Sequence, residues 1–336
     1  MNLKKKLFNA LVLSAAAASF QSAHAQEESN LQVKGKVWSQ FTYDLTKDSD
    51  HKNGFDIYRA FLQADYKFGP EWSTTLILDG ARTGAPKDYL GNYVRNAYVQ
   101  QSGLLGEGSS FRFGLQPTAY ISTIDGTMKT RWLGKNLVDQ TSLVPSQDAG
   151  ASLAAKAGVL GYGVTVRNGT EGLTKPGNSD NALSYDAWVS AKGFAGGALE
   201  DLGVVVYDSV KSKSTIVGST DTSSNLLAAA VTLSNSTLDA AAELALRRQN
   251  DVNATGYGLT LNFKADEEFA LYARFFAGNK AFQTGALASK NLLTVGPTYA
   301  FANGKVSTGL LFENAPTVIA GGITSRKVLW NWAANF

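Results

Sequence analysis

The last ten residues of the chain, KVLWNWAANF, alternate between two kinds of side chain. Val328, Trp330, Trp332, Ala334 and Phe336 are apolar or aromatic, whereas the residues between them are mostly polar or small. A β-strand places successive side chains on opposite faces, so this pattern predicts a strand with one apolar, aromatic wall. Barrel strands in a lipid bilayer carry such a wall because their outer surface contacts hydrocarbon and aromatic residues gather at both interfaces. We therefore expect a membrane-spanning β-barrel.

The first residues predict export from the cytoplasm. A basic start at Lys4–Lys6 precedes a short apolar segment, and Ala23-His24-Ala25 forms a small-residue cleavage site. We expect residues 1–25 to be a cleaved signal peptide and residues 26–336 to be a single barrel domain. Cleavage of the signal peptide removes three lysines and leaves 28 basic and 28 acidic residues in the rest of the chain. Overall charge therefore gives no argument for an anionic macromolecule, and we expect no nucleic-acid partner.

The composition argues against enzymatic sites. The chain has no cysteine, and His51 is the only histidine outside the predicted signal peptide. Thiolate metal sites are excluded, and a catalytic triad would have to be built around His51. We therefore expect no cofactor, no metal site and no enzyme. An outer-membrane protease or phospholipase using His51 is one alternative, and a structural barrel or adhesin plugged by its own loops is another.

The two-residue alternation continues along most of the chain. It is clear in residues 55–68 and 257–263, weaker in 202–211 and 225–233, and in 93–101 it does not show which face is which. Counting all such segments predicts an all-β fold, a transmembrane antiparallel up-and-down barrel of about sixteen strands. Short turns alternate with long polar loops, as expected for a barrel with one tight rim. A soluble sheet with one wet face would explain single strands, but not this sorting of loops.

The long third loop, residues 117–147, interrupts the alternation. It runs for about thirty residues, a length that is usually functional or disordered, and it is too apolar to be a solvated loop. We expect it to fold back inside the barrel and to constrict the lumen. Its charged residues are the candidate constriction: Asp125, Lys129, Arg131, Lys135 and Asp139. The charges that alternation points inward from the wall are Arg59, Asp65, Lys67, Arg112, Lys156, Arg167, Glu243 and Arg274. Alternatively, most of these charges only hydrate the lumen and pair with one another.

The order of segments in residues 55–154 resembles the phosphate-selective porin family of Gram-negative outer membranes. The motifs that carry the resemblance are Phe55–Leu62 followed by Gly69 and Trp72, then Ala97-Tyr98-Val99, Arg112–Gln116, and finally Leu137-Val138 with Pro145 and Asp148–Gly150. The resemblance implies a sixteen-stranded porin with an inward third loop, assembled as a homotrimer. Tyr58 departs from it, because members often carry the first of two arginines there, and the sequence shows no ladder of inward arginines.

Together these observations predict a porin in the outer membrane of a Gram-negative bacterium. It would form a water-filled channel for passive diffusion of small hydrophilic solutes and ions, with a weak anion preference. Expected partners are the lipid bilayer, lipopolysaccharide, small anions and the barrel-assembly machinery. Trp330, Trp332 and Phe336 are the predicted assembly signal.

Overall fold

The computed structural model describes residues 30–47, 53–82, 90–169, 182–194, 201–213, 223–249, 252–279, 291–316 and 324–336. The predicted signal peptide and His51 lie outside these residues.

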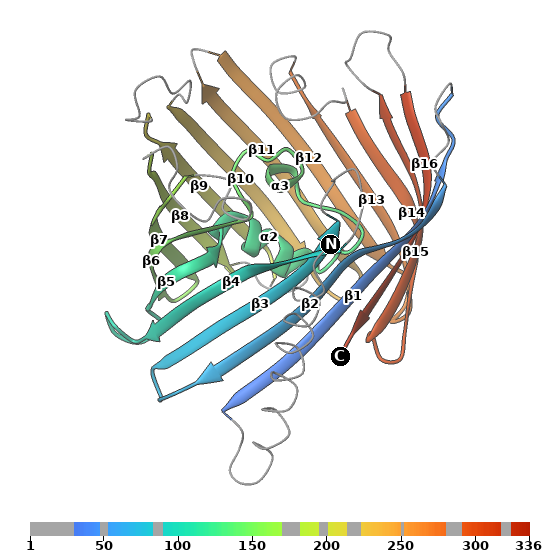
Figure 1. Cartoon of the computed structure of the whole chain (residues 1–336). Helices are drawn as coiled ribbons and strands as arrows, with labels where there is room; N and C mark the ends of the chain where they lie inside the picture. The colour runs from blue at the N-terminus through green and yellow to red at the C-terminus, as the bar shows by residue number, and fades with distance from the viewer. Residues whose placement is uncertain are drawn as a thin grey trace, which may run out of the picture.

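Sixteen antiparallel strands form a closed barrel in which each strand pairs with its neighbours in the chain and β16 pairs with β1 (Figure 1). This confirms the predicted all-β, up-and-down antiparallel barrel. The strands are β1 (Leu31–Asp44), β2 (Gly54–Lys67), β3 (Trp72–Arg82), β4 (Leu90–Ser102), β5 (Ser110–Pro117), β6 (Gln147–Ala157), β7 (Leu160–Arg167), β8 (Ser184–Lys192), β9 (Gly203–Lys211), β10 (Ser224–Ser234), β11 (Leu238–Gln249), β12 (Val252–Lys264), β13 (Phe269–Gly278), β14 (Asn291–Phe301), β15 (Val306–Pro316) and β16 (Thr324–Asn335).

The seam between β1 and β16 closes the barrel. Pairing runs from Lys36 opposite Asn335 to Asp44 opposite Lys327, as expected for the last strand closing against the first. Beyond this run, Gly35 donates to the carbonyl of Phe336 at 2.7 Å, and Phe336 donates back at 2.9 Å. The ring of Phe336 covers Gly35 so closely that any Cβ there would lie 2.1 Å from it. The last backbone pair of the seam therefore depends on a glycine.

Aromatic side chains cluster on the apolar outer face of the barrel. Tyr66, Phe68 and Trp72 stack in succession around the short turn between β2 and β3. Trp332 packs against Phe301 and Trp330 at the other side of the seam. Many other large aliphatic and aromatic side chains of the described strands are exposed as well. This wall is suited to contact with hydrocarbon.

The third loop contains two helices, α2 (Ala119–Met128) and α3 (Leu137–Gln140), and Figure 1 shows both inside the barrel. Helix α2 packs against β9, β10 and β11, and α3 packs against β11 and β12. No helix in the described part of the chain is long and apolar enough to cross a membrane.

The inner wall beneath α2 is apolar, which explains the weak alternation of two strands. Side chains of β9–β11 that point inward form a buried group, here called the inner apolar patch: Val205, Tyr207, Leu226, Ala228, Ala230, Ala241 and Ala245. In β9 and β10 both faces are therefore largely apolar, one toward the outside and one toward the loop, whereas the inner face of β11 also carries Asp239 and Glu243. The two-residue pattern is faint in 202–211 and 225–233 because the loop, rather than water, covers their inner face.

Candidate constriction site in the barrel lumen

Helix α2 attaches the third loop to the inner apolar patch. Tyr120, Ile121, Ile124 and Met128 are its buried residues, and their spacing places them along one side of the helix. The helix ends at Lys129, which adopts a left-handed conformation with φ of 52° and donates its N–H to the carbonyl of Asp125. The side chain of Lys129 is exposed.

Helix α3 is short and is stabilised by polar contacts at its start. Asn136 is the N-cap residue, and its side-chain oxygen accepts the N–H of Asp139 at 3.0 Å. The same side chain donates to Asp125 at 3.0 Å and so links α3 to α2. The two helices therefore form one unit rather than two independent turns.

Buried polar groups of the barrel wall anchor this unit. The Glu243 carboxylate on β11 accepts the N–H of Leu137 at 3.0 Å and the hydroxyl of Tyr120 at 3.2 Å. Arg274 on β13 donates to the carbonyl of Lys135 at 3.1 Å. Burial of a carboxylate in an apolar wall is costly unless its hydrogen bonds are made. Here those bonds come from both loop helices, so the carboxylate ties them to one strand.

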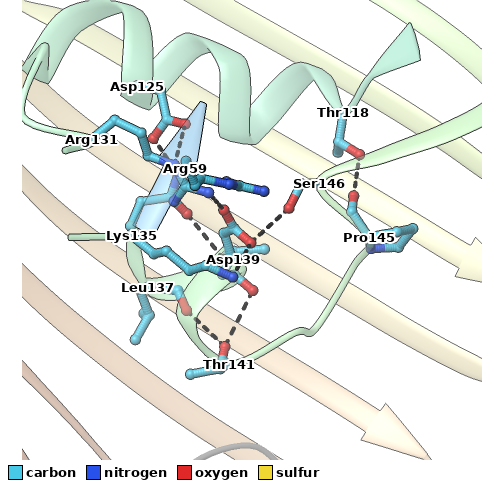
Figure 2. A network of polar contacts seen from close by, with 12 residues as sticks. Arg59, Thr118, Asp125, Arg131, Lys135, Leu137, Asp139, Thr141, Pro145 and Ser146 are labelled. Atoms are coloured by element: carbon cyan, nitrogen blue, oxygen red, sulfur yellow. Dashed lines mark hydrogen bonds and ion pairs between the residues drawn. The ribbon is translucent and has the colours of Figure 1, made fainter. Parts of the chain in front are cut away.

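The loop charges form a compact ion-pair group, shown in Figure 2. Arg131 pairs with Asp125 at 3.4 Å and with Asp139, and Lys135 reaches Asp139 at 3.4 Å. Ser146 donates its hydroxyl to Asp139 at 2.7 Å. The acidic residues of the loop are thus largely neutralised by basic residues of the same loop.

The two loop carboxyls respond oppositely to this environment. Burial raises the pKa of Asp125, and the nearby Arg131 offsets only part of the effect, so the pKa lies above its ordinary value. Burial also opposes ionisation of Asp139, but Arg131 and Lys135 outweigh it and hold that pKa below the ordinary value. Arg95 from the barrel wall also lowers the pKa of both carboxyls. The wall and the loop therefore interact electrostatically across this part of the lumen.

On the wall, two arginines share one carboxylate. Arg59 on β2 lies 2.9 Å from Asp79, and Arg95 on β4 lies 3.1 Å from the same oxygen of Asp79. Tyr93 donates its hydroxyl to that oxygen at 2.8 Å. Both guanidinium groups also lie over the ring of Phe61, at 5.2 and 5.3 Å from its centre. Cation–π contacts and a shared counter-ion hold the like charges together.

Two β-bulges place these arginines. In β2, Arg59 pairs with Trp38 but the next pair joins Ser39 to Ile57, so Tyr58 is an extra residue. In β4, Asn96 pairs with Ile77 but the next pair is Leu78 with Val94, so Arg95 itself is extra. Bulges redirect side chains in this way, often beside functional sites. Arg95 was missed by the sequence analysis because parity cannot assign a face to a bulged residue.

Arg59, Asp79, Arg95, Asp125, Arg131, Lys135 and Asp139 are here called the constriction cluster. The wall and loop parts are close enough to interact, because Arg95 lowers the pKa of both loop carboxyls, and Figure 2 draws Arg59 in front of the loop ion pairs. The side chains of Arg59, Arg95 and Arg131 are 12%, 16% and 11% exposed, and Asp79 is fully buried.

The other predicted wall charges are not members of this cluster, although Arg274 contacts Lys135 and Glu243 anchors the loop beside it. Arg167, Glu243 and Arg274 are buried, with Arg167 between Asp148 and Asp186. Asp65 pairs with Lys34 at 3.4 Å, and Arg112 donates to Gln100 at 2.6 Å and lies over Tyr98. Lys67 and Lys156 are exposed near short turns. In the described residues, no three His, Cys, Asp or Glu side chains are placed to hold a metal ion.

Comparison with solved structures shows extensive similarity of fold. The outer membrane channel DcaP of Acinetobacter baumannii superposes with a TM-score of 0.65 at 10% identity, covering 91% of this chain and 97% of that one. OmpF of Salmonella typhi, in a complex with daunomycin, gives a TM-score of 0.61 at 13% identity, with 91% and 97% coverage. A loop L8 deletion mutant of OmpT, an outer membrane protein of Vibrio cholerae, gives a TM-score of 0.61 at 14% identity, with 91% and 99% coverage.

Sequence comparison adds no closer assignment. No protein-family model matches the chain. A search of curated proteins gave no significant match. At 10–14% identity the structural likeness shows the fold. The chain has the closed sixteen-stranded barrel fold that is found in bacterial outer-membrane channels.

Proposed function

We propose that this protein is a porin of the outer membrane of a Gram-negative bacterium. Residues 26–336, after removal of the signal peptide, would form one barrel domain that lets small hydrophilic solutes and ions diffuse passively. The observation that carries the proposal is the third loop packed inside a sixteen-stranded barrel, with its charges facing a charged wall. A barrel of this size is wide enough for an aqueous lumen, and an inward loop narrows it.

The outer wall supports the membrane location. It exposes many large apolar side chains, and the aromatic group Tyr66, Phe68 and Trp72 suits a lipid interface. Contact with the bilayer and with lipopolysaccharide follows from this placement. Assembly by the barrel-assembly machinery, with Trp330, Trp332 and Phe336 as its signal, is part of the same proposal. A homotrimer is also proposed, since a trimer form is known for the similar OmpT of Vibrio cholerae.

A weak anion preference fits the charges of the constriction. Lys129 is exposed, the side chain of Lys135 is 35% exposed, and the charge of Arg131 acts on Arg95 of the wall. The resemblance to phosphate-selective porins remains a prediction, and no comparison supports phosphate as the solute. Neutralising Lys129, Arg131 and Lys135 together should lower the anion-to-cation permeability ratio. An unchanged ratio would place the selective part of the channel elsewhere.

Single-channel conductance of the purified, folded protein in a planar bilayer is the decisive test. Discrete conductance steps that scale with salt concentration are expected, with a reversal potential on the anion side in a potassium chloride gradient. A folded barrel without conductance would favour the plugged structural alternative. A hydrolytic activity that His51→Ala abolishes would favour the enzyme alternative, and clear cation selectivity would refute the anion preference.

A further inference from the structure

The charge balance of the constriction cluster bears on the valence of the anions that pass. We propose that this channel admits monovalent anions in preference to multivalent ones, and that the buried carboxylate of Asp79 sets this preference. The inference rests on the proposed porin function and adds a substrate class to it.

The cluster carries little excess charge. Counting only the groups that its ion pairs join, four basic groups, Arg59, Arg95, Arg131 and Lys135, face three carboxylates, Asp79, Asp125 and Asp139, an excess of one positive charge. Arg274 beside them has its own counter-ion, Glu313, at 3.8 Å. Every basic group has an acidic partner within 3.4 Å or in direct contact. The arginines are therefore not a free positive surface.

Valence enters the energetics of passage in two ways. Attraction to a fixed excess charge grows in proportion to the charge of the ion. The desolvation cost of entering a narrow, partly dry site grows with the square of that charge, as in Born solvation. Doubling the charge of an anion doubles the attraction but quadruples the cost. With an excess of only one positive charge, the cost outweighs the attraction for a divalent anion.

The arginines also lack freedom to reorganise around a multivalent oxyanion. Arg59 and Arg95 are fixed between Asp79 and the ring of Phe61, which itself packs edge-on against Trp38 at 5.0 Å. A bidentate grip on a phosphate or sulfate requires a guanidinium that is free to present its paired N–H groups. To do so here, an arginine would have to release Asp79 and leave that carboxylate exposed beside the anion.

Asp79 is the group on which this balance depends. Its side chain is fully buried, and one of its oxygens serves Arg59, Arg95 and Tyr93 together. Asp79→Asn has nearly the same shape and keeps a carbonyl oxygen, but it doubles the excess positive charge of the cluster. The variant should therefore weaken the discrimination against divalent anions.

The test measures reversal potentials of single channels in gradients of potassium chloride and of potassium sulfate. The wild-type protein should be anion-selective in chloride and should shift toward cation selectivity in sulfate. Asp79→Asn should raise the sulfate-to-chloride permeability ratio roughly fivefold, the effect expected of one partly screened charge. Asp125→Asn, on the loop side of the cluster, should act in the same direction if Asp79→Asn fails to fold.

Asp201→Asn is the matched control. Asp201 forms an exposed pair with Lys192 outside the cluster, so it changes the total charge of the protein equally but should leave the permeability ratio unchanged. Channels that pass sulfate as readily as chloride would overturn the inference while leaving the porin function intact. An unchanged ratio in Asp79→Asn and Asp125→Asn would also overturn it. Absence of any channel in potassium chloride would instead overturn the proposed function, and the inference with it.

Discussion

Glu243 should hold the third loop in place, and its replacement tests how firmly the constriction is fixed. Glu243→Ala removes the acceptor of the Leu137 N–H and one acceptor of the Tyr120 hydroxyl. Tyr120 keeps the carbonyl of Ala229 at 3.2 Å, whereas the N–H of the buried Leu137 is left without this partner. The substitution therefore weakens the attachment of the loop mainly at the start of α3, where the Leu137 N–H loses its acceptor.

The free energy by which Glu243→Ala weakens docking of the loop follows from these contacts. A hydrogen bond to a charged group contributes about 1.5–3 kcal/mol, and an orphaned buried donor costs a similar amount. Since Tyr120 retains a partner, we expect docking of the loop to weaken by about 2–4 kcal/mol. The fully buried apolar side chains of the loop contribute about 1.5–3 kcal/mol each, which is larger in total. The loop should therefore stay mostly docked while its detached state becomes roughly 30- to 1,000-fold more populated.

The absence of native cysteine provides a direct assay for the detached state. Val138 lies in the loop and is fully buried, so Val138→Cys should react with a small thiol reagent only when the loop opens. Adding Glu243→Ala should speed this reaction by the same roughly 30- to 1,000-fold as the detached state gains in population. It should also increase the current noise of the open channel. Glu243→Gln, which keeps one oxygen acceptor, should have a smaller effect. Glu268→Ala, on a short turn, is the control. If Glu243→Ala changed the rate of Val138→Cys labelling by less than about twofold, apolar packing alone would hold the loop.

Three further predictions follow from other parts of the structure. Because burial raises the pKa of Asp125 while Arg131 and Lys135 lower the pKa of Asp139, Asp125 should protonate before Asp139 as pH falls, so anion selectivity in chloride should increase at acidic pH. The increase should vanish in Asp125→Asn, and its persistence there would assign the titration to another group. Gly114 has φ of +126°, and a Cβ there would lie 2.3 Å from the carbonyl oxygen of Ala97. Gly114→Ala should therefore reduce the yield of heat-modifiable folded barrel, whereas Gly126→Ala, where a Cβ meets nothing within 4 Å, should not. Deletion of Phe336 should impair folding yield more than the conductance of channels that do form, and the reverse result would contradict its predicted role in assembly.

Much of the fold could be predicted from the sequence because a barrel repeats one simple rule. Each strand separates an apolar outside from a polar inside, so alternation in segments such as 55–68 predicts both the strand and its orientation. The third loop was recognisable for the opposite reason, since residues 117–147 are apolar without any two-residue period. The structure places them inside the barrel as two helices on the wall.

The partners of single charges could not be predicted in the same way. Alternation points Glu243 and Arg274 inward, but it does not show that the loop covers them. Whether an inward charge meets water or a loop depends on which strands the loop packs against, a long-range contact. The weak alternation of β9 and β10 was the available signal, because an inner face that is apolar must be covered by something.

Arg59 was among the predicted inward charges, but Arg95, which shares Asp79 with it, could not be predicted, for a different physical reason. Alternation assigns a face by parity, and a bulge adds one residue, so parity reverses across it. In β4, Tyr93 and Asn96 face inward on either side of the bulged Arg95, which is why residues 93–101 showed no consistent face. A bulge costs ladder hydrogen bonds and persists only where the redirected side chain is held by other contacts, as Asp79 and Phe61 hold Arg95. In β4, the loss of regular alternation therefore marks the bulge that carries Arg95, whereas in β9 and β10 it marks an inner face covered by the third loop.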